Sequence, residues 1–134
     1  MITVVVTPVY AGLLALMLVA LSVVTIRQRR HARAALGDRG VPGLQRAIRA
    51  HGNFTEYVPL ALVLMLMAEL TRHPAWLLHT LGLTLLLGRL CHAWGITRSE
   101  ENFRWRVVGM SLTFAVLISA ALALLGHSVG VLAL

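Results

Sequence analysis

Apolar residues run along this chain in four long stretches that are separated by short polar segments. The stretches cover roughly residues 4–26, 53–71, 75–97 and 105–126. A helix needs about 20 apolar residues, at a rise of about 1.5 Å each, to cross about 30 Å of hydrocarbon. The pattern therefore predicts four transmembrane helices, which with their polar ends cover approximately residues 4–26, 44–71, 74–97 and 104–126. Because they take up most of the chain, we expect one membrane domain over residues 1–134.

The composition agrees with a membrane location. Of the 134 residues, 58% are hydrophobic and only 13% are charged, and the mean hydropathy is +0.81. Soluble domains usually carry about 25% charged residues. We therefore expect an all-α integral membrane protein, a four-helix bundle. The first stretch is not expected to be a cleavable signal peptide, because its basic residues follow the apolar run instead of preceding it.

The positive charges are distributed unevenly between the links. All twelve basic residues are arginines, and the formal net charge is +7. Arginines crowd the link between the first and second stretches, among them Arg27, Arg29, Arg30, Arg33, Arg39 and Arg46. Arg98 and Arg104 follow the third stretch, whereas the second link holds only Arg72 and His73. Arginine-rich links stay in the cytoplasm, so both termini are expected outside. This explains the arginines without a nucleic-acid partner; membrane lipids are their expected surroundings.

Polar residues at the head of the second helix share one face, which we call the polar stripe: Arg46, Arg49, Asn53, Glu56 and Tyr57. At 100° per residue they fall within an arc of about 100°. His51 and Glu69 fall on the opposite side. An ionised group that faces lipid costs on the order of 2.5–3.5 kcal/mol. The polar stripe must therefore face other helices, a partner subunit or a water-filled cleft.

Geometry alone leaves two interpretations of the polar stripe open. In the first, Arg49 and Glu56 belong to a structural network and are satisfied by neighbouring helices. In the second, the stripe binds a small zwitterionic ligand. Arg49 would then bind its carboxylates, Glu56 its ammonium group and Asn53 its amide groups.

Other functional classes have weaker support in the sequence. A haem-binding bundle could use His51 and His92, although His51 lies away from the polar stripe. A small multidrug transporter usually needs a carboxylate in its first span, and residues 4–26 contain none. Cys91 is the single cysteine, so neither an intrachain disulfide nor a cysteine-based zinc site is expected, and we predict no metal.

The segment RAHGNFTEYVPL, from Arg49 to Leu60, resembles the signature of the MAPEG family, membrane proteins of eicosanoid and glutathione metabolism. The family pattern Arg-x3-Asn-x2-Glu-Tyr-x-Pro-Leu is matched at every defined position. The hydropathy resembles the family over essentially the whole chain. The resemblance implies a homotrimer of four-helix subunits, with glutathione held between neighbouring subunits near the cytoplasmic face.

The resemblance also implies roles for individual residues. Arg49, Asn53, Glu56 and Tyr57 match glutathione-contacting positions of the family. Further ligand-binding candidates are Arg27, Arg30, Arg46, Arg89 and His92. Leukotriene synthases of the family have tyrosines on the third helix, where this chain has His92 and Ile96 instead.

An arginine near the start of the fourth helix stabilises the glutathione thiolate in the family. Arg106 lies at about the matching place, and Arg104 is the alternative. The two are about 200° apart on a helix, so at most one can point into a given cleft.

The implied activity is that of a glutathione-dependent membrane transferase or peroxidase. A free thiol has a pKa of about 8.5, and a nearby guanidinium lowers it, so that more of the nucleophilic thiolate forms. The thiolate would attack hydrophobic electrophiles that arrive from the lipid. The chain looks like the bacterial branch of the family, which implies the inner membrane. The alternative is a non-catalytic glutathione-binding or scaffold protein.

Overall fold

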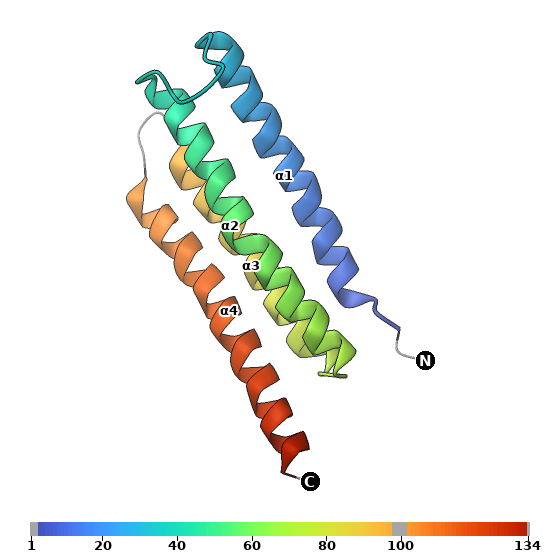
Figure 1. The fold of residues 1–134 in the computed structure, drawn as a ribbon. Helices are drawn as coiled ribbons and strands as arrows, with labels where there is room; N and C mark the ends of the chain where they lie inside the picture. Colours follow the sequence, from blue (N-terminus) through green and yellow to red (C-terminus); the bar gives the residue numbers. More distant parts are fainter. Residues whose placement is uncertain (1–2, 98–101, 134) are drawn as a thin grey trace.

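A computed structural model describes residues 3–97 and 102–133, and in these residues the chain forms four helices (Figure 1). They are α1 (Val6–His31), α2 (Pro42–Leu70), α3 (Ala75–Thr97) and α4 (Phe103–Leu132). The link between α1 and α2 lies at one end of the bundle, and both termini lie at the other end with the link between α2 and α3 (Figure 1). This is the arrangement that an up-and-down membrane bundle requires.

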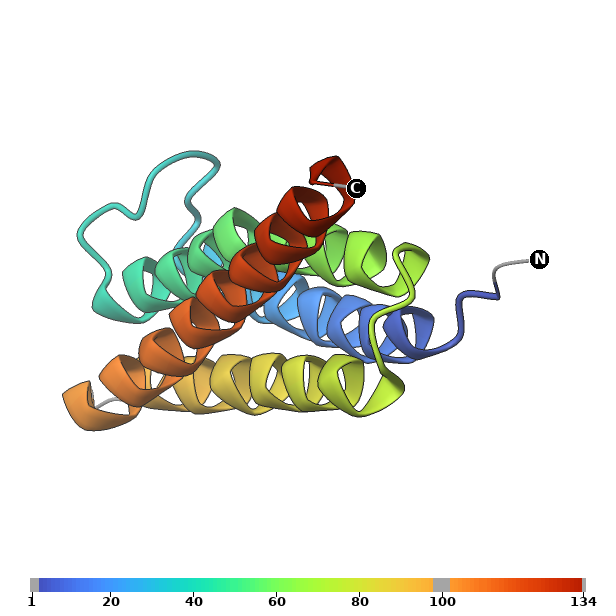
Figure 2. The same cartoon turned by 90° about the horizontal axis from the view of Figure 1, so that it is seen from below.

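The two central helices hold the bundle together. α2 and α3 contact each other and both remaining helices, whereas no contact joins α1 to α4 within the described residues. Figure 2 shows α4 crossing over α2 and α3 on the face opposite α1. A site built on α2 and α3 can therefore be completed by α4 from one side.

Three of the four helices, α1, α2 and α4, are long and apolar enough to cross a membrane. α3 has 23 residues, a length of about 35 Å at 1.5 Å per residue. It carries His79, Arg89 and His92 among its leucines and is not among the three. The prediction of transmembrane helices is thus confirmed for three of the four stretches.

Helix ends differ from the predicted ones at both sides of the bundle. α1 continues through the arginines that follow residue 26 and ends at His31, and α4 continues from residue 126 to Leu132. The apolar stretches follow the thickness of hydrocarbon, whereas a helix continues until a breaking residue or a turn. Arginine and glutamine are good helix formers, so α1 extends into its polar end.

Gly88 and Gly95 of α3 and Gly109 of α4 bring the two helices into backbone contact, and we call these three residues the glycine seam. A Cβ atom added to Gly109 would lie 2.5 Å from the Gly88 carbonyl oxygen and 2.6 Å from the His92 backbone nitrogen. A Cβ atom on Gly95 would lie 2.8 Å from the Arg106 backbone nitrogen. Small residues allow this close approach between membrane helices. The glycine seam places the ends of α3 and α4 that carry His92 and Arg106 next to each other.

The carboxylate of Glu69 fastens α1 to α2 at the end of the bundle where the termini lie. The backbone N–H groups of Val5, Val6 and Thr7 donate to its two oxygens at 2.6, 2.7 and 2.7 Å. These groups have no partner within a helix, and they form the positive end of the helix dipole. A buried carboxylate is therefore satisfied here without a basic partner.

The glycine seam predicts a stability difference between two alanine variants of α4. Gly109→Ala forces α3 and α4 apart, and such overpacking costs about 1–3 kcal/mol. Gly126→Ala is the matched control, because nothing lies within 4 Å of its added Cβ. In detergent, the thermal midpoint of Gly109→Ala should fall by several degrees, and that of Gly126→Ala should not fall. Equal midpoints would contradict the observed packing.

Candidate functional site

A cleft of about 340 Å³ opens between α2, α3 and α4. It lies near the start of α4, at the end of the bundle that carries the link between α1 and α2 (Figure 1). Its lining residues are Asn53, His92, Phe103, Arg106, Val107, Met110, Ser111 and Phe114. Polar groups of three helices thus face an apolar wall from α4. We call this space the α4 cleft.

A buried hydrogen bond sets the orientation of the Asn53 amide. Nη2 of Arg89 donates to Oδ1 of Asn53 at 2.8 Å, and Arg89 itself is only 1% exposed. A guanidinium has donors and no acceptor, so the amide atom that faces it must be the oxygen. The NH₂ group of Asn53 is then left to donate to an acceptor in the α4 cleft.

Two further donor atoms of Arg89 have no partner in the part of the chain that the structure describes. Its Nε and Nη1 atoms are buried and have no hydrogen-bond partner in the described part of the chain. A buried charge with unmade hydrogen bonds destabilises a fold by several kcal/mol. The one hydrogen bond that Arg89 makes in the described chain fixes the orientation of Asn53.

Arg106 and His92 approach the α4 cleft from two helices that the glycine seam holds together. His92 is 4% exposed and lines the cleft from α3, and Arg106 lines it from the first turn of α4. Arg104 is exposed and is not among the lining residues. The structure thus places one arginine of the pair at the cleft and the other outside it.

A profile of the MAPEG family matches residues 7–126 of the chain. The chain belongs to the MAPEG family. It is also 45% identical, over 118 residues, to the inner membrane protein YecN of Escherichia coli K12, and the match covers 88% of each chain. YecN from E. coli O6:H1 shows the same identity and coverage. Together with the three apolar helices, these matches make the chain a multi-pass integral membrane protein of the MAPEG family.

The residues of the MAPEG motif are divided between two surfaces of α2. Asn53 lines the α4 cleft, and the Tyr57 ring packs edge-on against Phe114 of α4, with ring centroids 5.5 Å apart. Arg49 and Glu56 are exposed, and their side chains make no hydrogen bond or ion pair within residues 3–97 and 102–133. The structural network considered for Arg49 and Glu56 is therefore not formed among the described residues.

The residues that the helical angles exclude from the polar stripe lie on the far side of α2. Nε2 of His51 is 3.1 Å from the Ser22 hydroxyl oxygen of α1. Glu69 binds the start of α1, as described above. This part of the sequence prediction is confirmed.

Three further arginines of the sequence prediction lie near the α1–α2 link. Arg27 and Arg30 are exposed on the last turns of α1. Arg46 is half-buried, and its Nε atom is buried without a partner in the described chain. None of the three lines the α4 cleft.

The apolar wall of the α4 cleft was not predicted from the sequence. Phe103, Val107, Met110 and Phe114 are spaced by four, three and four residues, which places them on one helical face. The same angular analysis that defined the polar stripe could have found this face. It was missed because these four side chains do not stand out among the other apolar residues of a hydrophobic stretch.

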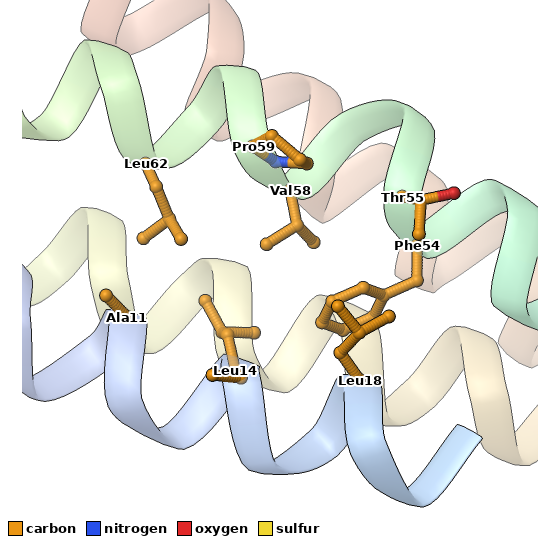
Figure 3. Close-up of a pocket in the computed structure, with 9 residues that line it drawn as sticks. Ala11, Leu14, Leu18, Phe54, Thr55, Val58, Pro59 and Leu62 are labelled. Carbon is orange, nitrogen blue, oxygen red and sulfur yellow. The ribbon is translucent and has the colours of Figure 1, made fainter. Parts of the chain in front are cut away.

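A second cavity, a groove of about 200 Å³, lies between α1 and α2. Figure 3 shows Leu14 and Leu18 of α1 facing Phe54, Val58 and Leu62 of α2 across this groove. The hydroxyl of Thr55, its single polar side chain, donates to the Gly52 carbonyl oxygen at 2.8 Å. The groove is therefore chemically suited to hydrocarbon and not to glutathione.

The unsatisfied guanidinium predicts an unusual stability result. Arg89→Met removes a buried charge and keeps much of the side-chain volume, so the thermal midpoint in detergent should stay equal or rise. Leu85→Ala, at another buried position of α3, shows the sensitivity of the measurement, because such a truncation costs about 2–5 kcal/mol. A loss of stability in Arg89→Met as large as that in Leu85→Ala would show that Arg89 is structural.

Proposed function

We propose that this protein is a glutathione-dependent membrane transferase or peroxidase. The observation that carries the proposal is the α4 cleft, where the oriented NH₂ group of Asn53 and the guanidinium of Arg106 face an apolar wall. Donors and a positive charge suit the carboxylates, amides and thiolate of glutathione. The apolar wall suits the hydrophobic electrophile.

We further propose that three copies assemble and that glutathione lies between neighbouring copies. Arg49 and Glu56 are exposed in one subunit, although each would cost on the order of 2.5–3.5 kcal/mol if it faced lipid. A neighbouring subunit together with a zwitterionic ligand would cover both. Arg49 would then bind a glutathione carboxylate and Glu56 its ammonium group, and Arg27, Arg30 and Arg46 would lie near the other carboxylate.

The proposed orientation places this site at the cytoplasmic face of the inner membrane. α3 packs against every other helix, so it must cross the bilayer with them. The arginine-rich link between α1 and α2 would be cytoplasmic, and both termini would be outside. The word "inner" in the name of the E. coli relative supports this location.

Arg106 would activate the thiol. A guanidinium beside the sulfur lowers the pKa of the glutathione thiol, because it stabilises the negative thiolate. The thiolate then attacks an electrophilic carbon, forming a carbon–sulfur bond as a leaving group departs or a ring opens. With a peroxide, the sulfur attacks an oxygen atom and the O–O bond breaks. Electrophiles dissolved in the bilayer could reach the apolar wall of the α4 cleft directly.

Three alternative functions differ from the proposed enzyme in the ligand they bind or in whether the thiol is activated. A glutathione-binding protein without activity would keep the contacts of Arg49, Asn53 and Glu56 and would fail to activate the thiol. A haem-binding bundle has little support, because His51 is bonded to Ser22 on the side of α2 away from His92 and the α4 cleft. A small transporter would need a carboxylate in α1, and that helix contains none.

Three arginine variants test the proposal. Arg49→Ala should abolish glutathione binding, measured by calorimetry in detergent, because it removes the partner of a carboxylate. Arg106→Ala should bind glutathione with a similar Kd but lose about 10²–10³ in turnover of an apolar electrophile, since the thiolate is no longer stabilised. Arg104→Ala is the control and should change neither quantity.

Two results would overturn the assignment. Unchanged glutathione affinity in Arg49→Ala would refute the proposed binding site. A wild-type protein that binds glutathione but turns over no electrophile or peroxide would refute the enzyme proposal and favour the binding protein.

A further inference from the structure

His92 is an almost completely buried imidazole whose side chain has no hydrogen-bond partner among the described residues. It is 4% exposed and lies on the α3 side of the glycine seam, where its backbone nitrogen approaches Gly109. Buried polar side chains in proteins are nearly always hydrogen-bonded. By comparison, the buried hydroxyl of Thr113 donates to the Gly109 carbonyl oxygen at 2.8 Å. The missing partner of His92 is the observation that needs an explanation.

The free nitrogen atoms of His92 reach the α4 cleft. Some side-chain nitrogen and oxygen atoms of the described chain are buried and have no hydrogen-bond partner. They belong to Thr7, Arg46 and Arg89. The ring nitrogens of His92 are not among them, and His92 lines the cleft. Its hydrogen-bonding capacity is therefore directed at whatever occupies this space.

Among the residues that line the α4 cleft, His92 alone has a side chain that can act as a Brønsted base. The guanidinium of Arg106 is already protonated, and the Asn53 amide and the Ser111 hydroxyl are not bases. The other lining residues are apolar. A ligand that must lose a proton in this cleft has one side chain to give it to.

Two positive charges lie near His92. Arg89 on its own helix and Arg106 on α4 act on it electrostatically. From α2, Asn53 is uncharged, and Tyr57 acts on Arg89. A bound ligand with two carboxylates would offset the arginine charges.

We propose that His92 is the general base that removes the thiol proton of glutathione; this inference rests on the proposed function. The S–H bond breaks as an N–H bond forms at the free ring nitrogen, and the electron pair stays on sulfur beside Arg106. The imidazolium then returns the proton to the leaving group or to the oxygen or carbon anion formed on the electrophile. Base and cation thus have separate tasks: His92 accepts the proton and Arg106 stabilises the resulting charge.

The test follows thiolate formation directly after rapid mixing with glutathione, by ultraviolet absorbance. All proteins carry Cys91→Ser, which removes the single cysteine of the chain and its background signal. His92→Gln keeps a hydrogen-bonding side chain but cannot take up the proton. Its Kd for glutathione should stay within about threefold, and thiolate formation should slow by about 10²–10⁴.

Two further measurements separate a base from a structural residue. In His92→Ala, imidazole added to the buffer should restore part of the rate, because it fits the space of the missing ring. In the Cys91→Ser parent, which needs no change at His92, thiolate formation should be slower in D₂O because a proton moves in that step. A merely structural histidine would give no rescue by imidazole, whereas the D₂O effect shows that a proton moves in the measured step.

The failure of this inference is distinguishable from failure of the proposed function. If the parent protein forms the thiolate but His92→Gln forms it within twofold of the same rate, or if D₂O has no effect, His92 is not the base and the proposed function stands. If the parent protein neither binds glutathione nor forms the thiolate, both are overturned.

Discussion

Arg89 donates a 2.8 Å hydrogen bond to Asn53 from inside the bundle, and the chemistry of the α4 cleft depends on that bond. Because a guanidinium can only donate, it turns the amide so that its NH₂ group serves the cleft. Two other Arg89 donor atoms are buried without a partner among the described residues, and this costs the described chain free energy. Such a cost is typical of functional sites, where a local rule is broken for the benefit of a ligand.

The glycine seam gives this arrangement its rigidity. Gly88, Gly95 and Gly109 let α3 and α4 touch through their backbones, which fixes His92 relative to Arg106. A site built on packed helices holds its groups more firmly than one built on loops. The exposed pair of Arg49 and Glu56 lies on another surface of α2, so one subunit presents only part of the proposed glutathione site.

The periodicity of apolar residues was sufficient to predict the helices. It also predicted that His51 lies on the side of α2 opposite to the polar stripe, because helical angles are set by local geometry. The motif from Arg49 to Leu60 was sufficient to predict the family, which the family profile confirms. The Arg89–Asn53 bond and the apolar wall of α4 could not be predicted, since they depend on how separate helices pack. The subunit also divides the polar stripe in two, and helical angles alone do not reveal where the neighbouring helices lie.

The most direct test of the central claim, that this cleft activates glutathione, is a pH titration of the bound thiol. Ultraviolet absorbance of the thiolate is followed while saturating protein and glutathione are titrated together, and again with glutathione alone. The account predicts that the bound thiol ionises at a lower pH than the free thiol, whose pKa is about 8.5. Glutathione that binds with an unchanged thiol pKa would contradict it.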